Sequence, residues 1–371
     1  MAKIFSEFSI GDLTISNRIL VSPMCQYSAH EGNANSWHLM HLGQMATSGA
    51  GLVIIEATAV TAEGRITSSD LGLYCDENEE SLANVLKEVR KYTNTKFAIQ
   101  LAHAGRKASS NPPWKGGRQV RTNDPGGWQT LAPSPIAHGQ NEENPMPLDI
   151  NGMANIKNAF VASALRAVRL GIDGIEIHMA HGYLLHEFLS PLSNHREDEY
   201  GGTLSNRMRF PIEVFKAVRA AVPVTTPVWV RVSATDWVES GWGLDQTIAL
   251  IKELQKFGCA AVDVSTGGLS REQVVKLGPG YQVPFAKKIK METGATTIAV
   301  GLITKPEQAE SIIVSGDADL VAIGRSLLFN PRWPWHAAAH LGAQIDAPPQ
   351  YWRSSPLNNQ DIFKGAPTDS R

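Results

Sequence analysis

Eight short runs of β-branched and other apolar residues recur along the chain, and segments with helical periodicity separate them. Most runs are apolar on both faces, which is typical of parallel strands buried between a core and a layer of helices. A strand followed by a helix, repeated eight times, favours a closed (β/α)8 TIM barrel over the alternative, a doubly wound open sheet. The eight runs are residues 19–24, 51–58, 97–101, 174–180, 228–233, 261–266, 297–301 and 320–324.

Two helix signals support this alternation. Residues 155–170 carry apolar side chains at every fourth position from Ile156 to Val168, which makes one stripe along a helix. Residues 304–307 (Thr-Lys-Pro-Glu) have the spacing of a capping box. They predict the start of the helix after the seventh strand.

Two segments depart from the regular alternation. Residues 108–134, after the third strand, are rich in glycine and proline, and a connection of this length is usually functional or disordered. Its two tryptophans favour an ordered lid over the barrel mouth rather than a disordered loop. Residues 356–371 are polar without periodicity and predict a flexible tail. We therefore expect one domain over residues 1–355, followed by that tail.

The bulk composition argues against several classes of protein. A net charge of −2 over 371 residues gives no electrostatic reason to expect a nucleic acid or an anionic membrane as a partner. No apolar stretch reaches the about 18 residues of a membrane helix, and charges interrupt the first residues, so we expect no signal peptide. Three cysteines without Cys-x-x-Cys spacing predict neither a zinc site nor disulfides, which fits a reducing, cytoplasmic setting.

Two polar clusters coincide with the ends of predicted strands. Cys25 and Tyr27 follow the first run, whereas His178, His181 and Tyr183 follow the fourth. Every strand of a parallel barrel directs its carboxyl end to one shared mouth, so residues this far apart in sequence can meet there. A thiol, two imidazoles and a phenol around one pocket suggest a redox cofactor with proton donors beside it.

The two histidines admit three interpretations. We favour a pair that donates two hydrogen bonds to one substrate oxygen, but His178 and His181 could also bind a metal or be core residues. No third metal ligand with suitable spacing is evident. Tyr183 could donate a proton to an enolate-like carbon, and Tyr27 could reach the same substrate oxygen. Cys25 lacks the histidine and asparagine context of a hydrolytic nucleophile, so a role in modulating a cofactor is preferred.

Charge and glycine at other strand ends point to an anionic ligand. Arg231 lies inside an apolar run, so it either forms an internal salt bridge or faces an anion, such as the N1 region of a reduced flavin. Gln100 could hydrogen-bond the edge of a planar ring. The last two runs end in Gly301 and Gly324, and Arg325 follows the latter. This combination predicts a phosphate site, with plain turn glycines as the alternative.

Four longer motifs contain or flank these residues. They are residues 22–27 (SPMCQY), 100–107 (QLAHAGRK), 178–183 (HMAHGY) and 190–202 (SPLSNHREDEYGG). Together they resemble the old yellow enzyme family of NADH:flavin oxidoreductases, over about Phe5 to Arg353. Cys25, where the other branch carries threonine, makes the chain similar to the thermophilic-like bacterial class of xenobiotic reductases and NADPH dehydrogenases.

The resemblance implies a barrel with non-covalent FMN at its mouth and NADPH or NADH as the hydride donor. It implies that His178, His181 and Tyr27 bind the activating oxygen of the substrate and that Tyr183 gives the proton. It also implies a homodimer or homotetramer in which Arg353 reaches the neighbouring subunit's site. The flavin-binding residues that it implies are Ser22, Pro23, Met24, Cys25 (which would tune the flavin), Ala57, Gln100, Arg231, Gly301, Gly324 and Arg325.

The sequence therefore predicts an FMN-dependent ene-reductase with a ping-pong mechanism. It would take hydride from NAD(P)H and reduce the activated C=C bonds of small electron-poor alkenes, namely α,β-unsaturated carbonyl or nitro compounds. Two rivals remain open. A metal-dependent barrel hydrolase or lyase would use His178 and His181 as ligands. A non-catalytic binding scaffold would leave Arg231 and the paired glycines without a role.

Overall fold

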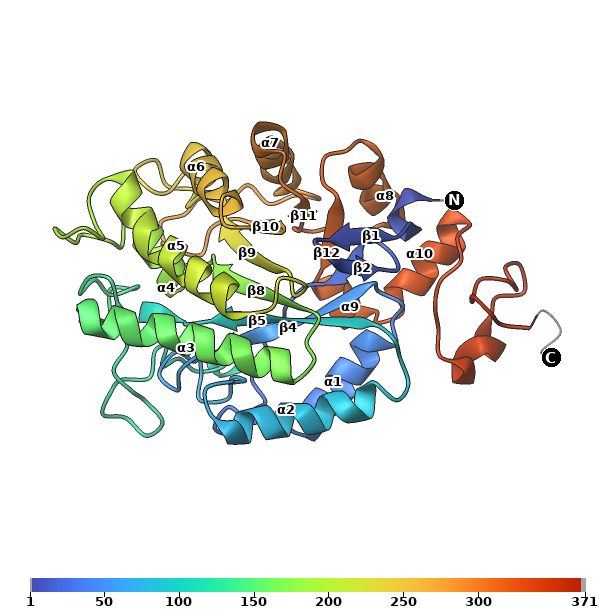
Figure 1. The fold of residues 1–371 in the computed structure, drawn as a ribbon, viewed down its shortest axis with the longest axis horizontal. Helices are drawn as coiled ribbons and strands as arrows, with labels where there is room; N and C mark the ends of the chain where they lie inside the picture. Colours follow the sequence, from blue (N-terminus) through green and yellow to red (C-terminus); the bar gives the residue numbers. More distant parts are fainter. Residues whose placement is uncertain (1, 368–371) are drawn as a thin grey trace.

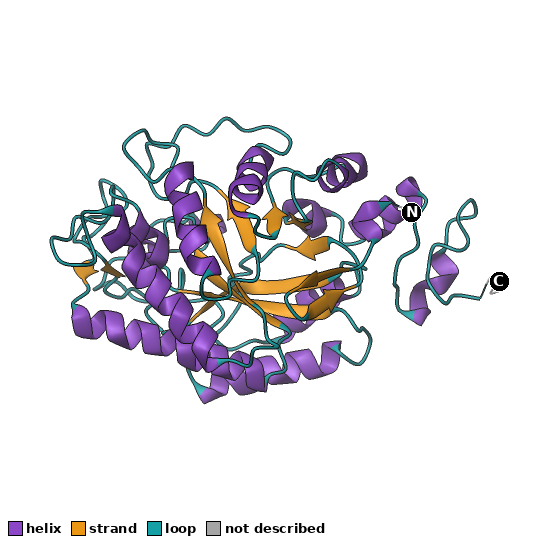
Figure 2. Ribbon diagram, turned by 45° about the horizontal axis from the view of Figure 1, so that its top comes forward, coloured by secondary structure: helices purple, strands orange, loops and turns teal. Residues whose placement is uncertain are grey.

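The computed structural model describes residues 2–367, and its centre is a closed barrel of eight parallel strands (Figures 1 and 2). The strands follow one another around the barrel in chain order. The TIM barrel predicted from the eightfold repeat is thus confirmed, and the open sheet is excluded. The barrel strands are β3 (Ile19–Val21), β4 (Leu52–Ala59), β5 (Lys96–Ala102), β8 (Gly174–Met179), β9 (Val228–Ser233), β10 (Val262–Ser265), β11 (Thr297–Ala299) and β12 (Leu320–Ile323).

Helices surround the barrel as an outer layer, as Figure 2 shows. They bury their apolar faces against the outer sides of the strands, and these contacts form the larger of two hydrophobic cores. Within residues 2–367 no helix is long and apolar enough to cross a bilayer. The helices are α1 (Ser36–Ala46), α2 (Asp76–Val89), α3 (Ile150–Arg169), α4 (Leu184–Leu189), α5 (Leu204–Ala221), α6 (Leu244–Gln255), α7 (Val283–Thr293), α8 (Pro306–Val314), α9 (Arg325–Phe329) and α10 (Trp333–Leu341).

A β-hairpin closes the end of the barrel at which the strands begin. Strands β1 (Phe8–Ile10) and β2 (Leu13–Ile15) pair antiparallel, and their apolar side chains join the second hydrophobic core inside the barrel, with Trp229. The sequence pattern does not predict this hairpin. Its strands have three residues each, too few for a periodic signal, and Gly11 with a φ of 55° is the main mark of the turn.

The predicted helix signals were correct in place but not in detail. Helix α3 begins at Ile150, five residues before the predicted start at residue 155, and the Asp149 side chain caps it by accepting from the Gly152 N–H. The predicted capping box at residues 304–307 is wrong. Pro306 occupies the first turn of α8, so Lys305 becomes the N-cap, and its side chain makes no capping hydrogen bond.

The segment after β5 is ordered by its own hydrogen bonds. It contains the 3-10 turns η2 (Gly105–Lys107) and η3 (Pro113–Lys115), and its strand β6 (Leu131–Ala132) pairs with β7 (Met146–Pro147). The Trp128 indole donates to the Glu63 carbonyl at 2.8 Å. The Trp114 ring lies edge-on, 5.6 Å from the Tyr27 ring. The segment thus contacts a predicted site residue, and its role as a lid stays a prediction.

The predicted flexible tail packs against the body for part of its length. Ile345 and the tail are joined by a hydrogen bond of 2.8 Å from the Ile345 N–H to the Ile362 carbonyl. The Phe363 ring is buried and lies 4.9 Å from the Trp335 ring on α10. The chain reaches this point through η4 (Pro349–Ser354), which Figure 1 shows at the edge of the molecule. The last predicted tail residues, 368–371, lie outside the described residues, as does residue 1; η1 (Lys3–Phe5) opens the described chain.

Candidate active site

The carboxyl ends of the barrel strands bring the two polar clusters together. Across the barrel, the Arg231 guanidinium at the end of β9 donates to the Ser22 hydroxyl after β3 at 3.2 Å. Tyr183, after β8, lies near enough to the loop after β3 for Cys25 and Tyr27 to influence its ionisation. The two motifs therefore share one mouth, as the barrel topology requires.

His178, His181 and Tyr183 form a group of three rings at this mouth. The His178 ring lies edge-on to both others, 5.1 Å from the His181 ring and 4.9 Å from the Tyr183 ring. His181 (φ 59°) and Gly182 (φ 72°) have left-handed backbones, and the His181 N–H donates to the Ser233 hydroxyl at 2.9 Å. This tight turn folds the chain back so that the three rings face one space.

Hydrogen bonds fix how the two imidazoles can donate. The Ala180 N–H donates to Nδ1 of His178 at 3.1 Å, so the proton of the neutral ring lies on Nε2. Nδ1 of His181 lies 3.3 Å from that Nε2, and Nε2 of His181 lies 2.7 Å from the Ser265 hydroxyl. Nε2 of His178 therefore donates to Nδ1 of His181, whose own proton lies on Nε2 and is donated to Ser265, and the Ser265 hydroxyl donates in turn to Oε1 of Gln282 at 3.3 Å.

Both imidazoles are neutral at pH 7. Burial in the first place, and then the positive charge of Arg231, hold the pKa values of His178 and His181 well below the usual range. A neutral ring can still donate an N–H hydrogen bond. The pair can therefore polarise a ligand oxygen on which negative charge develops.

The turn that carries His181 packs directly against the loop after β10. A Cβ on Gly182 would lie 2.3 Å from the Gly268 carbonyl oxygen. Lys107 bridges the same two loops, since its ammonium donates to the carbonyls of His181 at 2.8 Å and Gly268 at 2.9 Å. The ammonium also lies 5.1 Å from the centre of the Tyr183 ring, and burial lowers the pKa of Lys107 to about 8.

A buried carboxyl group holds the loop that carries Cys25 and Tyr27. Glu56 on β4 accepts from the Gln26 N–H at 2.8 Å and lies 3.5 Å from Nε2 of His38 on α1. Burial raises the pKa of Glu56 to about 8 and raises that of the Cys25 thiol well above its usual value. Cys25 is therefore a neutral thiol at pH 7, and it lies against the backbone of Ala57.

Arg231 stands above an acidic layer inside the barrel. Its Nε lies 3.5 Å from Asp263 on β10. Glu176 on β8 accepts from Nε2 of Gln100 and from Nε1 of Trp229, each at 2.7 Å. Arg231 thus has an internal ion pair and also donates toward the mouth. The internal salt bridge that the sequence left open is thus present, and the interpretation that Arg231 faces an anion stays a prediction.

The ends of β11 and β12 form a second part of the mouth. Gly301 follows β11 with a φ of 116°, and Gly324 follows β12. A Cβ on Gly324 would first meet the Met24 sulfur at 3.5 Å, so this backbone borders the loop after β3. Arg325 is exposed, and its guanidinium has no partner among residues 2–367. Open glycine backbone and an unpaired guanidinium are the donors that a phosphate requires.

These groups fit a flavin mononucleotide. Arg231 and Gln100 offer donors to a planar ring, and the Arg231 Nε is buried without a hydrogen-bond partner among the described residues. Arg325 and the two glycines offer a phosphate site. The metal alternative lacks ligands, because no group of three or more His, Cys, Asp or Glu side chains in residues 2–367 could hold a metal ion.

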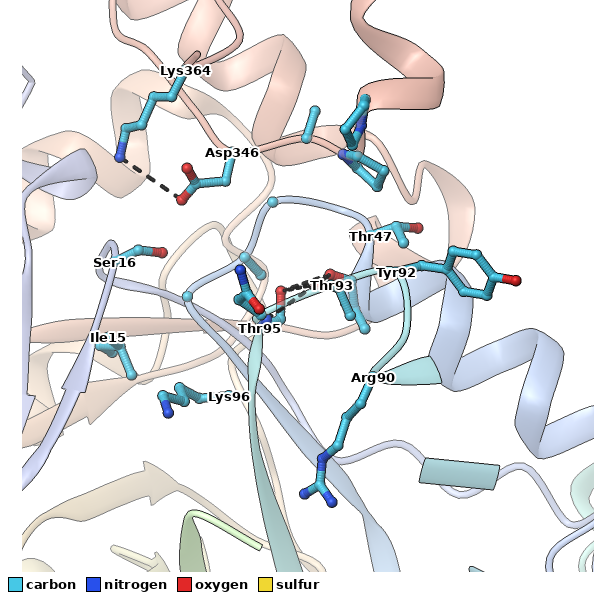
Figure 3. A pocket seen from close by; sticks show the side chains of 18 of the residues that line it. Ile15, Ser16, Thr47, Arg90, Tyr92, Thr93, Thr95, Lys96, Asp346 and Lys364 are labelled. Carbon is cyan, nitrogen blue, oxygen red and sulfur yellow. Dashed lines mark hydrogen bonds and ion pairs between the residues drawn. The ribbon is translucent and has the colours of Figure 1, made fainter. Parts of the chain in front are cut away.

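A cavity of about 660 Å³ lies at the other end of the barrel (Figure 3). Its lining includes residues at the start of barrel strands, such as Gly51 and Lys96, and Pro349 of the C-terminal segment, but no predicted site residue. The C-terminal segment therefore borders the base of the barrel. Arg353, exposed on η4, does not lie at the mouth of its own chain.

Several polar residues of the site were missed by the sequence analysis. Glu176 and Asp263 are charges inside apolar runs, so the signal that identified Arg231 could have found them as well. Lys107 lies within a quoted motif, but its side chain was given no role. Ser233 and Ser265 carry no distinguishing signal, because a serine at the end of a strand is common.

A sequence model of the NADH:flavin oxidoreductase / NADH oxidase family matches residues 3–344. The NADPH dehydrogenase of Listeria monocytogenes serovar 1/2a is 43% identical over 356 residues, which cover 95% of this chain and 99% of that protein. NADH:flavin oxidoreductase FG08077 of Gibberella zeae is 43% identical over 361 residues, 92% of this chain and 87% of that protein.

Solved structures share the barrel. Morphinone reductase superposes with a TM-score of 0.75 at 24% identity, covering 99% of this chain and 96% of that chain. A 2-naphthoyl-CoA reductase superposes with a TM-score of 0.82 at 21% identity over 92% of this chain. This chain spans about half of that reductase, 52% of its length. At these identities the likeness shows the fold alone.

Proposed function

Because the chain belongs to the NADH:flavin oxidoreductase / NADH oxidase family, the old yellow enzymes, we propose that it is an ene-reductase acting on activated alkenes. The chain is an NAD(P)H-dependent flavin oxidoreductase with FMN as its cofactor. FMN, when bound, accepts hydride from NAD(P)H and delivers it to a second substrate that takes the place of the nicotinamide. The proposed substrates are α,β-unsaturated carbonyl and nitro compounds, reduced by a ping-pong mechanism.

The observation that carries this proposal is the pair of neutral imidazoles beside a buried phenol. His178 directs its Nε2–H to the space that the three rings face, and His181 would direct a second N–H to the same oxygen once its proton lies on Nδ1, 3.3 Å from that Nε2. When an alkene conjugated to that oxygen is reduced, negative charge grows on the oxygen. Two donors aimed at it therefore stabilise the transition state more than the bound substrate. Tyr27 is proposed as a further donor to the same oxygen.

Tyr183 is proposed to supply the proton to the second carbon of the alkene. Burial raises the pKa of Tyr183 well above its usual value, so the phenol stays protonated in the neutral range. It would release its proton only to a strongly basic carbon. The Lys107 ammonium, 5.1 Å from the ring centre, would stabilise the phenolate that remains.

The proposed flavin site uses the other residues of the mouth. Arg231 and Gln100 would bind the pyrimidine side of the ring, with Cys25 tuning it. Gly301, Gly324 and Arg325 would bind the phosphate. The remaining proposed ring contacts are Ser22, Pro23, Met24 and Ala57, all of which lie on β4 or in the loop after β3.

A second subunit is proposed to complete the site through Arg353. This arginine is exposed at the base of its own barrel, so it can serve a mouth only in a neighbouring copy. Trp37 and Met40 on α1, with Phe329 at the end of α9, are exposed apolar side chains that suit burial between subunits. A homodimer or homotetramer is proposed, in a reducing cytoplasmic setting that fits three free cysteines.

Anaerobic stopped-flow measurement of the two half-reactions tests the function with Tyr183→Phe. Reduction of the flavin by NADPH should change little. Reoxidation by cyclohexenone should slow by about 10²–10⁴-fold, the usual contribution of a general acid. Tyr200→Phe is the matched control, since Tyr200 is a buried phenol outside the mouth, and it should change neither step. Equal losses in both half-reactions of Tyr183→Phe would refute the assignment, as would a wild-type protein that does not reduce the enone.

A further inference from the structure

We propose that Glu176 and Asp263 form a proton-exchanging pair beneath Arg231, through which reduction of the bound FMN takes up one more proton from solvent. Glu176 would be a positioning residue that acts through Arg231 and Gln100, without touching the substrate. The proposal rests on the placement of the flavin's pyrimidine side at Arg231, as proposed above. It needs no assumption about the alkene.

Strand register places these groups in two adjacent rows of the barrel interior, with Arg231 and Asp263 two residues nearer the carboxyl ends of the strands than Glu176 and Trp229. Gln100 on β5 pairs with Glu176 on β8, which pairs with Trp229 on β9, and Arg231 on β9 pairs with Asp263 on β10. Trp229 belongs to the apolar core that fills the barrel below. The two carboxyl groups are therefore bounded from beneath by apolar side chains, and the buried Arg231 and His178 lie on the side of the mouth.

The hydrogen bonds of the two carboxyl groups differ. Glu176 accepts from two neutral donors, Gln100 and Trp229, each at 2.7 Å. Asp263 has the Arg231 Nε at 3.5 Å, and neither of its oxygens has a hydrogen-bond partner among residues 2–367. Both carboxyl groups have no exposed surface. Two buried carboxylates beside one cation leave an uncompensated charge, which a shared proton removes.

The charges that face this pair are few. Asp263 and Arg231 are the charged groups that act on Glu176, from β10 and β9, while β5 contributes only the neutral Gln100. His178 lies two residues further along β8 than Glu176, and its imidazole is neutral. Burial and then the charge of Asp263 raise the pKa of Glu176 to about 8, and burial also raises the pKa of Asp263. Because the pKa values of both carboxyl groups are raised, the two groups together favour holding one proton between them beside the Arg231 guanidinium.

Reduction of the flavin changes this balance. Two electrons and one proton enter the flavin as hydride, which adds a negative charge beside Arg231. That charge raises the proton affinity of Glu176, so an ionised Glu176 takes one proton from solvent, and no other group is oxidised or reduced. By reciprocal linkage, protonation of Glu176 favours reduction. The added uptake occurs only above pH of about 8, where Glu176 is ionised before reduction.

The test is the midpoint potential of FMN in the holoenzyme, measured against a redox dye from pH 6 to 9.5. In the wild type, the pH dependence should correspond to one proton per two electrons at low pH and should rise toward two above pH of about 8. For Glu176→Gln, the pH dependence of the midpoint potential should correspond to one proton per two electrons from pH 6 to 9.5. Its potential should equal that of the wild type at pH 6, where Glu176 is already neutral, and exceed it at pH 9.

Glu187→Gln is the matched control. Burial also raises the pKa of Glu187 to about 8, but this residue accepts from the backbone of Arg106 rather than from the acidic layer. The control should behave as the wild type. Arg231→Gln should lower the potential at every pH, and an unchanged potential would overturn the flavin placement together with the proposal.

Three results would overturn the proposal while leaving the flavin placement intact. One is a wild-type slope of one proton at all pH values. Another is a Glu176→Gln potential raised equally at every pH, which would make Glu176 a fixed counter-ion. If Glu176→Gln does not retain FMN, Asp263→Asn serves as the test variant instead. Removal of the neighbouring carboxylate should move the pH range in which two protons accompany two electrons to lower pH. An unmoved region would be the third contrary result.

Discussion

Substitution of Gly182 by alanine would show how closely the two loops at the mouth must approach. Gly182 has a φ of 72°, a conformation that costs alanine about 1–2 kcal/mol. The added Cβ would lie 2.3 Å from the Gly268 oxygen, and ordinary contact begins at 3.4 Å, so the loops must separate by about 1 Å. Overpacking of this kind costs about 1–3 kcal/mol. We expect the free energy of unfolding to fall by about 2–5 kcal/mol.

The same separation would displace the catalytic turn. Lys107 holds the carbonyls of His181 and Gly268 with one ammonium, and it cannot keep both bonds when the loops part. A misplacement of about 1 Å in a catalytic group can reduce the rate about 10²-fold. The alkene half-reaction of Gly182→Ala should fall by that factor, and flavin reduction by NADPH should fall less, because it does not depend on the histidine pair in the same way.

Denaturant unfolding and stopped-flow measurements on two variants separate strain from contact. Gly202→Ala is the control, because Gly202 has a φ of 75° but an added Cβ there would have no neighbour within 4 Å. It should lose only about 1–2 kcal/mol and retain both half-reactions. If the two variants lose the same stability, or if Gly182→Ala keeps the alkene half-reaction, the close approach of the loops does not matter and the reasoning fails.

Two further predictions concern a buried carboxylate and the exposed arginine. Asp236 lies 2.9 Å from Nε2 of His186, whose Nδ1 accepts from the Gly182 N–H, and it accepts hydrogen bonds from Ser190 and Trp242; Asp236→Asn should therefore reduce the free energy of unfolding by about 1–3 kcal/mol at pH 7. Burial alone would raise the pKa of Asp236, but His186 and the hydrogen bonds lower it below its usual value. The stability that the ionised carboxylate confers is therefore lost as pH falls below about 4. Denaturant curves should show the difference in unfolding free energy between wild type and variant shrinking in that range. Arg353→Ala should raise the KM for the alkene about tenfold at unchanged FMN content, as loss of one charged hydrogen bond would; an unchanged KM would argue against a shared site.

The barrel could be predicted because its signal is repeated. Each strand is short, but eight apolar runs in alternation with helices leave few architectures, and the error in any one boundary does not affect the count. The boundaries themselves were less certain. The first predicted run extends to Met24, yet β3 ends at Val21, because the paired residues of β4 and β12 end there. The short β1–β2 hairpin had no comparable repeat and was missed.

The site could be predicted only where a residue type is unusual in its setting. Arg231 was conspicuous in an apolar strand, and His178 and His181 were conspicuous at a strand end. The groups that orient them were not, since Ser265 and the Ala180 N–H act through distances and angles that depend on the packing of separate strands. The proton positions on the two imidazoles therefore required the three-dimensional arrangement.

The acidic layer beneath Arg231 is a departure from how such barrels are usually filled. Bulky apolar side chains normally pack the interior in layers, and they do so here below Trp229. Replacing one such layer by Gln100, Glu176 and Asp263 with a single cation costs stability, because buried ion pairs rarely recover their desolvation energy. Structural neutralisation of Arg231 would need only Asp263. The second carboxyl group, Glu176, is therefore the part of the layer that a purely structural role leaves unexplained, and its ionisation is where the layer can act on the flavin.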